Sequence, residues 1–357
     1  MLRLTSLPQK TKSMNFFLHS PLTLGVLAIV GAAPSTAFAQ DNDSAWSFFG
    51  DARVRAEFND LAANPDRHRQ RLRFRFGGNF NVADNVTIGT RMRTESGDQN
   101  NPHWDIGNNF DNMDVSLDRM FVDYSPTWAD VRMKMGKFGH GFQANPVYGE
   151  LVWDGDVQPE GLAVSGSSGD FDWVVGQYAL TENGGPISED SWMTVGQVNT
   201  SKDDLKFAVG YYFYGDPDAA GAEAYTGTDV GNWGILNPIV SWKKDSLTIS
   251  GEYIENMRAG DGFDATGWAL GVSNGSPSDS GGKFYAQYQT VEEGAVFTTF
   301  AGDDFPGGRD DWKGLMGGWK RQLSDKIGLN IWALTHEQES INSETDYRFR
   351  IDFNIKF

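Results

Sequence analysis

Hydrophobic and polar residues alternate with a period of two along much of this chain. The pattern is clearest in YRFRIDFNIKF at 347–357, where one set of alternate positions is wholly apolar. That set consists of Tyr347, Phe349, Ile351, Phe353, Ile355 and Phe357. A period of two predicts β-strands with one apolar and one polar face. Such strands suit a soluble sandwich, where the apolar face packs on a second sheet, and also a membrane barrel, where it contacts lipid.

The pattern predicts sixteen strands, and the connections between them alternate in length. The expected strands cover 46–58, 68–82, 86–96, 117–126, 131–138, 161–166, 171–180, 191–200, 205–215, 234–244, 247–257, 266–275, 283–292, 312–323, 327–338 and 346–357. Every second connection is a short turn rich in Asp, Asn, Gly or Ser, which are typical turn residues. The others, such as 97–116, 139–160 and 216–233, are mostly longer.

Alternation of short and long connections places the long loops together at one end of the sheet. This layout is typical of a transmembrane up-and-down β-barrel with short periplasmic turns and long extracellular loops. A sandwich instead needs crossing connections between its sheets. We therefore predict an all-β fold, an antiparallel barrel of about sixteen strands. The C-terminal strand is expected to close it by pairing with the first strand, which leaves no edge unpaired.

The first part of the chain differs from the rest. A positively charged start precedes PLTLGVLAIVGAA at 21–33, an apolar stretch too short to span a bilayer as a helix. The residues AFA at 37–39 then form a small-x-small cleavage site. We predict a secretory signal peptide over 1–39 and a single outer-membrane barrel domain over 40–357.

Composition narrows the possible function classes. Asp and Glu number 48 against 30 Lys and Arg, a net charge of −18, and such an acidic chain argues against nucleic-acid binding. Cysteine is absent, so disulfides cannot supply rigidity to an exported protein. The lack of a long apolar run after residue 39 excludes a helical membrane protein but not a β-barrel, because alternation mixes apolar with polar residues.

Arginines occupy alternate positions on the second predicted strand and continue onto its neighbours. In RQRLRFRF at 69–76 the arginines share one face, and Leu72, Phe74 and Phe76 share the other. An Arg at the bilayer midplane costs roughly 2–4 kcal/mol on the lipid face, so the arginine face must contact water. A closed, packed interior could not hold so many cations, whereas sixteen strands enclose an aqueous channel. The predicted pore-lining basic residues are Arg53, Arg55, Arg69, Arg71, Arg73, Arg75, Arg91, Arg93, Arg132 and Lys134.

Crowded arginines need counter-charge, and the loop at 139–160 offers it. Its acidic residues, the candidate constriction-loop acids, are Glu150, Asp154, Asp156 and Glu160. If the loop folds inward, these acids face the arginines across the bore and create a transverse field that orients dipolar solutes. The alternative is an exposed loop whose acids bind divalent cations or no ligand. The sequence leaves both arrangements open.

Three stretches between residues 68 and 166 resemble a known family. They are RLRFRFGGNFNVADNVTIGTRMRTESGD, FVDYSPTWADVRMKMGKF and ELVWDGDVQPEGLAV. These stretches are similar to the Gram-negative family known as "putative porins". The resemblance implies a passive outer-membrane channel of about sixteen strands, a homotrimer as in general porins, and recognition of the C-terminal aromatic strand by the barrel-insertion machinery. The GKF-containing strand also resembles the phosphate-selective porins, although the clustered lysines of their bore are missing here.

Catalysis is not predicted. The histidines after the signal peptide lie on separate segments, without an HExxH motif, and no GxSxG elbow occurs. We therefore expect no catalytic residue, no metal site and no cofactor.

The predicted function is that of a porin in the bacterial outer membrane, reached through the periplasm, for passive diffusion of small polar or charged solutes. One alternative is an anion-selective, phosphate-type specific channel. Another is a barrel that is not a channel and serves as an adhesin, an enzyme or a structural anchor. The expected partners are outer-membrane lipid and lipopolysaccharide, small polar solutes or ions, and further copies of the chain.

Overall fold

The structure is a computed structural model that describes residues 45–62, 64–97, 99–107, 110–182, 190–215, 233–305, 310–340 and 344–357. These residues belong to one compact unit, Asn42–Phe357. The predicted signal peptide at 1–39 lies outside the described residues, as does most of the predicted loop at 216–233. Within the described ranges, no helix is long and apolar enough to cross a membrane.

Sixteen strands form the wall of the described structure, and a further short strand, β4 (Trp104–Asp105), lies inside a loop. The wall strands are β1 (Trp46–Asp60), β2 (Arg67–Ala83), β3 (Val86–Thr94), β5 (Val115–Tyr124), β6 (Val131–Lys137), β7 (Glu160–Ser168), β8 (Phe171–Thr181), β9 (Ser191–Lys202), β10 (Leu205–Gly215), β11 (Trp233–Lys244), β12 (Leu247–Asn256), β13 (Thr266–Asn274), β14 (Lys283–Val291), β15 (Trp312–Ser324), β16 (Ile327–Gln338) and β17 (Asp346–Lys356). They match the predicted strands to within a few residues.

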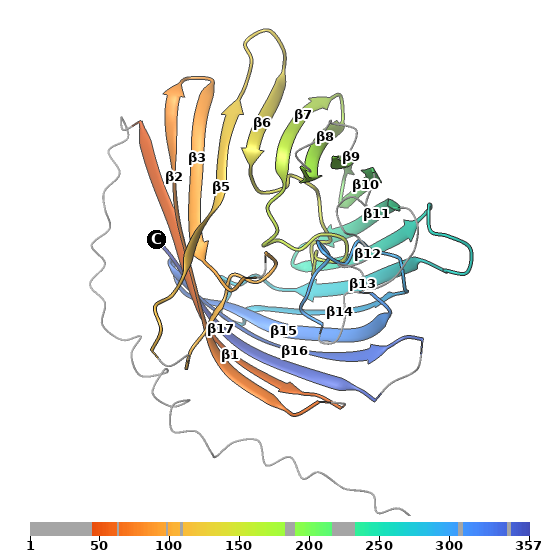
Figure 1. The fold of residues 1–357 in the computed structure, drawn as a ribbon. Coiled ribbons are helices and arrows are strands. Elements are labelled where there is room, and N and C mark those ends of the chain that lie inside the picture. The colour runs from red at the N-terminus through yellow and green to blue at the C-terminus, as the bar shows by residue number, and fades with distance from the viewer. Residues whose placement is uncertain are drawn as a thin grey trace, which may run out of the picture. The chain divides into compact units, whose positions relative to one another are not determined.

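The wall is a closed antiparallel barrel. Each strand pairs with its neighbours along the chain, and β1 pairs with both β2 and β17 (Figure 1). The last strand thus fills the edge that β1 would otherwise leave open, and each wall strand pairs with a neighbour on both sides. The predicted fold class, a sixteen-strand up-and-down barrel, is confirmed.

Two-residue turns join many strand pairs at one end of the barrel. Asp203 and Asp245 begin such turns with φ of 53° and 52°, and Gly169 begins another with φ of 60°. Positive φ at this position is typical of tight hairpins because its twist matches that of the strands. The longer connections, which include 95–114, 138–159 and 292–311, lie at the opposite end. The predicted alternation of short and long connections is confirmed.

The two faces of the strands differ as the period of two predicts. Phe74, Met92, Leu270 and Phe284 are among the apolar side chains exposed on the outer face. Arg55, Arg71 and other polar residues at the intervening positions are buried inside the ring. The outer face therefore suits hydrocarbon, whereas the charged side chains lie within the barrel.

The inner face is not polar all the way round, which the sequence did not lead us to expect. The inward side chains of β8–β12 near the long-loop end form an apolar wall that consists of Tyr178, Met193, Val195, Tyr212, Tyr214, Trp233, Ile235 and Ile254. Inward-folded loops cover this wall with apolar residues such as Phe142, Trp153 and Phe297. One side of the barrel interior is therefore a packed core, and the charged side chains gather on the other side.

Barrel closure gives a first prediction. A Cβ added at Gly50 of β1 would lie 2.4 Å from the ring of Phe357 and 2.8 Å from the carbonyl oxygen of Arg75, so the Gly50→Ala change should strain the closing seam. Overpacking of this kind costs about 1–3 kcal/mol. The matched control is Gly251→Ala, another outward strand glycine, where the nearest atoms lie 3.6 Å away. Urea unfolding in lipid vesicles should show destabilisation for Gly50→Ala alone, and equal midpoints would contradict the packing of this seam.

Candidate functional site

Arginines and acids alternate on the inner face of β17, β1 and β2 because of the strand register. Arg55 of β1 lies between Asp352 of β17 and Arg71 of β2. Glu57, two residues further along β1, lies between Arg350 and Arg69. Each acid is thus placed beside several guanidinium groups on neighbouring strands. We call the inner face of β17, β1, β2 and β3 the charged wall.

Glu57 is at the centre of the charged wall. Its side chain is fully buried, and the Nε atoms of Arg69 and Arg350 both donate to its carboxylate at 2.6 Å. A terminal nitrogen of Arg71 lies 3.6 Å away. Three cations therefore share one carboxylate, and their mutual repulsion is offset by this common partner.

Further strand acids pair with most of the other predicted basic residues. Asp352 accepts hydrogen bonds from Arg55 at 2.6 and 3.1 Å. Asp118 pairs in the same way with Arg91 and lies 4.0 Å from Nε of Arg93. Nearer the short-turn end, Asp123 of β5 accepts from Arg132 at 2.7 Å and lies 3.8 Å from Lys134. The predicted basic residues are therefore neutralised largely by the strands themselves.

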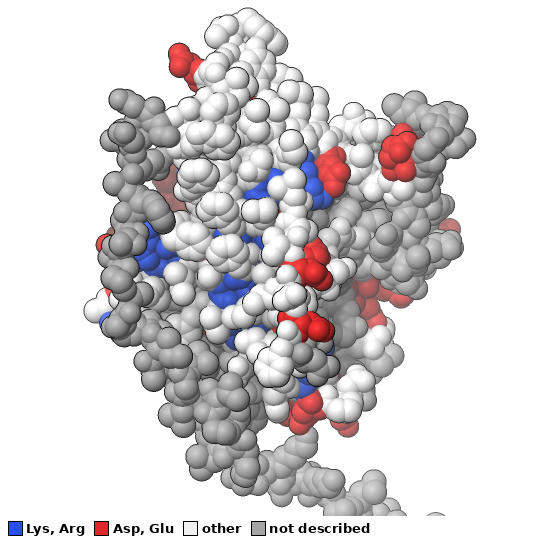
Figure 2. Space-filling view, turned by 60° about the vertical axis from the view of Figure 1, so that its left-hand side comes forward, with Lys and Arg blue, Asp and Glu red and all other residues white. Residues whose placement is uncertain are grey.

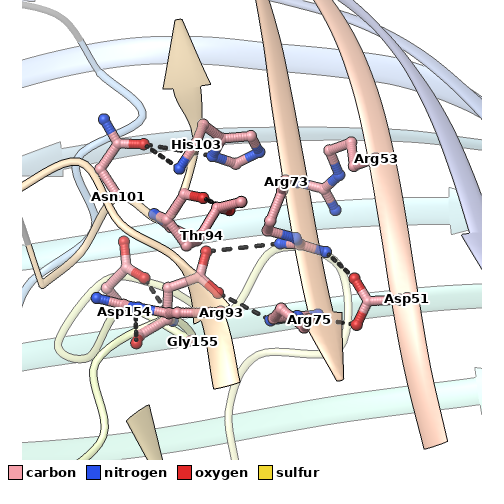
Figure 3. Close-up of polar contacts among 12 residues, drawn as sticks. Asp51, Arg53, Arg73, Arg75, Arg93, Thr94, Asn101, His103, Asp154 and Gly155 are labelled. Atoms are coloured by element: carbon pink, nitrogen blue, oxygen red, sulfur yellow. Dashed lines mark hydrogen bonds and ion pairs between the residues drawn. The ribbon is translucent and has the colours of Figure 1, made fainter. Parts of the chain in front are cut away.

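Two loops supply the remaining acids. Asp105 of β4 accepts from Arg69 at 3.1 Å and from Arg71 at 2.8 Å. Asp156, in the loop at 138–159, accepts from Arg75 at 3.0 Å and lies 3.7 Å from Arg73. Figure 3 shows Arg73 and Arg75 extending from β2 between Asp51 on one side and the inward loop on the other. The loop therefore lies directly opposite the arginines of β2.

Only one of the four candidate constriction-loop acids contacts the charged wall directly. Asp156 does so, whereas Asp154 accepts a hydrogen bond at 2.7 Å from the backbone N–H of Asp156 and so shapes the loop. Glu150 faces a second loop. Glu160 does not belong to this group, because it is the first residue of β7 and pairs with Lys137 at 2.5 Å on the outward face. Its position beside the predicted strand boundary explains the misplacement, since alternation along β7 turns it outward.

Two long loops fold into the barrel and bind each other. The backbone N–H of Gly302 donates to the carbonyl oxygen of Glu150 at 2.9 Å, and that of Asp154 donates to the carbonyl oxygen of Phe300 at 2.7 Å. The rings of Trp153 and Phe300 lie 5.0 Å apart. The segments 138–159 and 292–305 therefore form one unit, which we call the loop pair.

The loop pair is attached to strands around the ring. Gln143 and Gln197 of β9 exchange two hydrogen bonds, of 2.5 and 3.0 Å. Asn145 accepts from Ser250 of β12 at 2.7 Å, and Gln287 of β14 donates to the carbonyl oxygen of Tyr148 at 3.0 Å. Contacts with such widely separated strands require the loops to lie inside the barrel. Together with apolar packing on β8–β12, they hold the loop pair to one side.

Tyr148 connects two partly buried carboxyl groups in the loop pair. Its hydroxyl oxygen lies 2.9 Å from Glu150 and 2.9 Å from Asp304, and it has one proton to donate. Burial and the neighbouring Asp304 carboxylate raise the pKa of Glu150 to about 8. Burial opposes ionisation of Asp304 too, but Arg350 and Arg55 hold the pKa of that carboxyl well below its usual range. A protonated Glu150 can therefore donate to Tyr148, which donates to ionised Asp304.

Several residues of this site were missed by sequence reasoning. The acids Asp51 and Glu57 occupy the same alternate positions of β1 as Arg53 and Arg55, so strand parity alone would have placed them inside. Asp304 carried no comparable signal, because its contact with Arg350 depends on how a long loop folds. Within the described ranges, no cluster of His, Asp or Glu is suited to hold a metal ion.

The charges are also visible on the molecular surface. Figure 2 shows Lys and Arg side chains in a band through the middle of one face, with Asp and Glu beside them. Basic and acidic side chains therefore lie next to each other on this face.

Comparison with known proteins agrees with this architecture. Residues 51–233 match the family described as "Putative porin". Among solved structures, OprB of Pseudomonas putida has a TM-score of 0.61 at 12% identity, covering 88% of this chain and 94% of that one. OmpF of Salmonella typhi has a TM-score of 0.58 at 11% identity, and the match covers 87% of this chain and 97% of that one. An engineered porin of Rhodopseudomonas blastica has a TM-score of 0.54 at 13% identity, and the match covers 87% of this chain and 100% of that one. These likenesses show the fold, and no curated protein matches the sequence.

The charged wall gives a second prediction. Replacing Glu57 by Gln leaves Arg69, Arg71 and Arg350 without their shared counter-charge, and breaking a buried ion pair costs about 3–5 kcal/mol. The control is Glu160→Gln, which breaks the exposed pair with Lys137 and should cost about 0–1 kcal/mol. Equilibrium unfolding in lipid vesicles measures both. Similar losses for the two variants would show that Glu57 does not stabilise the barrel.

Glu150 gives a third prediction, which concerns pH. The folded state keeps the Glu150 proton up to about pH 8, whereas an unfolded carboxyl releases it near 4.5. The folded state then binds more protons in this window, so stability should fall as the pH rises through it, by an amount on the order of a few kcal/mol. Glu150→Gln should remove this part of the dependence. The test is the protection of the loop pair from proteolysis in wild type and in Glu150→Gln, measured from pH 5 to 9. If protection depends on pH in the same way in both proteins, the role of Glu150 is refuted.

Proposed function

This chain belongs to the "Putative porin" family, and from that membership we propose that it lets small polar or charged solutes diffuse passively through a bacterial outer membrane. The family and the barrel fold support a porin-type channel located in that membrane. The observation that carries the finer proposal is the division of the barrel interior. Apolar packing holds the loop pair on the β8–β12 side, and the charged side chains gather on the other side.

Three basic residues in the charged wall and on other strands support a preference for anions. Arg53, Arg119 and Lys320 have neutral groups as their nearest partners, namely Asn354, Gln158 and the ring of Tyr285. Their positive charge is therefore not cancelled by an acid in contact. Asp156 of the loop pairs directly with Arg75 and lies close to Arg73, so it cancels part of the positive charge that these arginines present. We expect anion preference to be modest, because most of the other arginines are paired.

The assembly and the lipid contacts are part of the same proposal. The apolar outer face, with Phe74, Met92 and Leu117 exposed, suits hydrocarbon or further copies of the chain. By analogy with general porins we propose a homotrimer, with lipopolysaccharide around it. The aromatic outward residues of β17 are the proposed signal for the barrel-insertion machinery.

Ion conductance tests the proposed channel and is our fourth prediction. Purified protein added to a planar lipid bilayer should give stepwise current increases, and a silent membrane would favour an adhesin, an enzyme or a structural anchor instead.

In a KCl gradient the reversal potential should indicate preference for chloride. Replacing Arg73 and Arg75 by Gln frees Asp51 and Asp156, so selectivity should move toward potassium. The control is Lys137→Gln, which removes a charge from the outer face. If wild type, the double variant and Lys137→Gln have equal reversal potentials, the ion path does not pass Arg73 and Arg75.

A further inference from the structure

A pocket of about 700 Å³ opens on the inner face near the short-turn end of the barrel. It lies over β15, β16, β17, β1 and β2, and the turn residues Pro277 and Asp325 reach its rim. Basic side chains outnumber acidic ones among its lining residues, which include Arg53, Arg73, Arg75 and Lys320. The pocket therefore lies on the expected solute path and carries excess positive charge.

Four of the seven basic residues that line the pocket, namely Arg53, Arg73, Arg75 and Lys320, fall into two pairs. Arg73 and Arg75 both donate to Asp51, at 2.9 and 2.8 Å, and both lie close to Asp156. Their charges are largely cancelled. Figure 3 shows these contacts, with Arg53 on the adjacent strand directed away from Asp51. Asp51, an acidic residue that lines the pocket, is therefore already paired with these two arginines.

Arg53 and Lys320 have no such compensation. Nε of Arg53 donates to the side-chain oxygen of Asn354 at 2.7 Å, and Nζ of Lys320 lies 4.7 Å from the ring centre of Tyr285. In the part of the chain that the structure describes, neither cation forms an ion pair, and no hydrogen bond engages the terminal nitrogens of Arg53. A partly buried guanidinium with unused donors favours an anionic partner.

Two amide groups complete the set of donors. Asn354 accepts from Arg53, and Asn330 accepts from the hydroxyl group of Tyr285 at 3.0 Å. Since each amide oxygen is engaged as an acceptor, the NH2 group of each side chain is left as a donor. Both asparagines line the pocket. The site thus offers a planar fork, a point charge and neutral donors, a combination that fits an oxyanion better than a chloride ion.

We propose that this pocket transiently binds a small divalent oxyanion, such as phosphate, sulfate or a short dicarboxylate, between Arg53 and Lys320. The inference rests on the proposed channel function and names a class of solute for it. Binding must be weak enough to permit release, and the neighbouring acid Asp51 limits the affinity. Such a site would raise the local concentration of divalent anions at one end of the channel.

The fifth prediction tests this site by block of chloride current. Single channels in KCl are exposed to phosphate, sulfate or succinate at constant ionic strength, on the side of the short turns. At least one of these anions should reduce the chloride current in a saturable manner. Arg53→Gln and Lys320→Gln should each raise the half-blocking concentration of the anion about tenfold. This is the effect expected from the loss of one charge-assisted contact. Which anions block identifies the class, tetrahedral or dicarboxylate.

Matched variants keep the result interpretable. Lys206→Gln removes an inward-facing charge on β10, outside the pocket, and should leave the block unchanged. Arg53→Lys keeps the charge but loses the fork, so its block should be intermediate. Conductance without saturable block, or equal block in wild type and in both pocket variants, would overturn the anion site and leave the channel intact. Absence of any conductance in wild type would instead overturn the channel on which the site depends.

Discussion

The burial of Glu57 among three arginines is the constraint on which the rest of this barrel depends. The pairing of β17 with β1 that closes the ring also places Arg350 and Asp352 beside Glu57 and Arg55. A slip of one residue in this register would turn the charged side chains toward lipid, at roughly 2–4 kcal/mol for each arginine near the midplane. Closure and charge balance are therefore satisfied by the same register, and neither can be changed alone.

The interior is divided because its two sides hold the loops in different ways. On the β8–β12 side, aromatic residues such as Tyr212 and Tyr214 pack against Phe142 and Phe297, which fixes the loop pair by burial of apolar surface. On the opposite side the loop pair presents Asp156 and Asp304 to the arginines of the charged wall. Apolar packing on one side therefore fixes where these acids meet the arginines on the other side.

Much of this arrangement could be read from the sequence, because a period of two assigns each strand residue to a face. The outward Phe74 and the inward Arg73 follow directly from it, and Asp51 and Glu57 would have followed had the same parity been applied to acids. The inward apolar wall could not be read in this way. An inward Tyr212 becomes apolar core only because a distant loop covers it, and alternation along β10 carries no trace of that loop. The same reason hides the contact between Asp304 and Arg350.

The pocket with Arg53 and Lys320 lies where the charged wall offers Arg53 an amide in place of an acid. Around Glu57 and Asp352, the strand register places an acid opposite Arg55, Arg69 and Arg350. One step nearer the short turns, Asn354 stands opposite Arg53, and an amide replaces the carboxylate. A carboxylate at that position would cancel the charge and close the site to anions. The neutral partner instead positions the guanidinium while leaving its charge available, which is the condition that a transient anion site in a channel must meet.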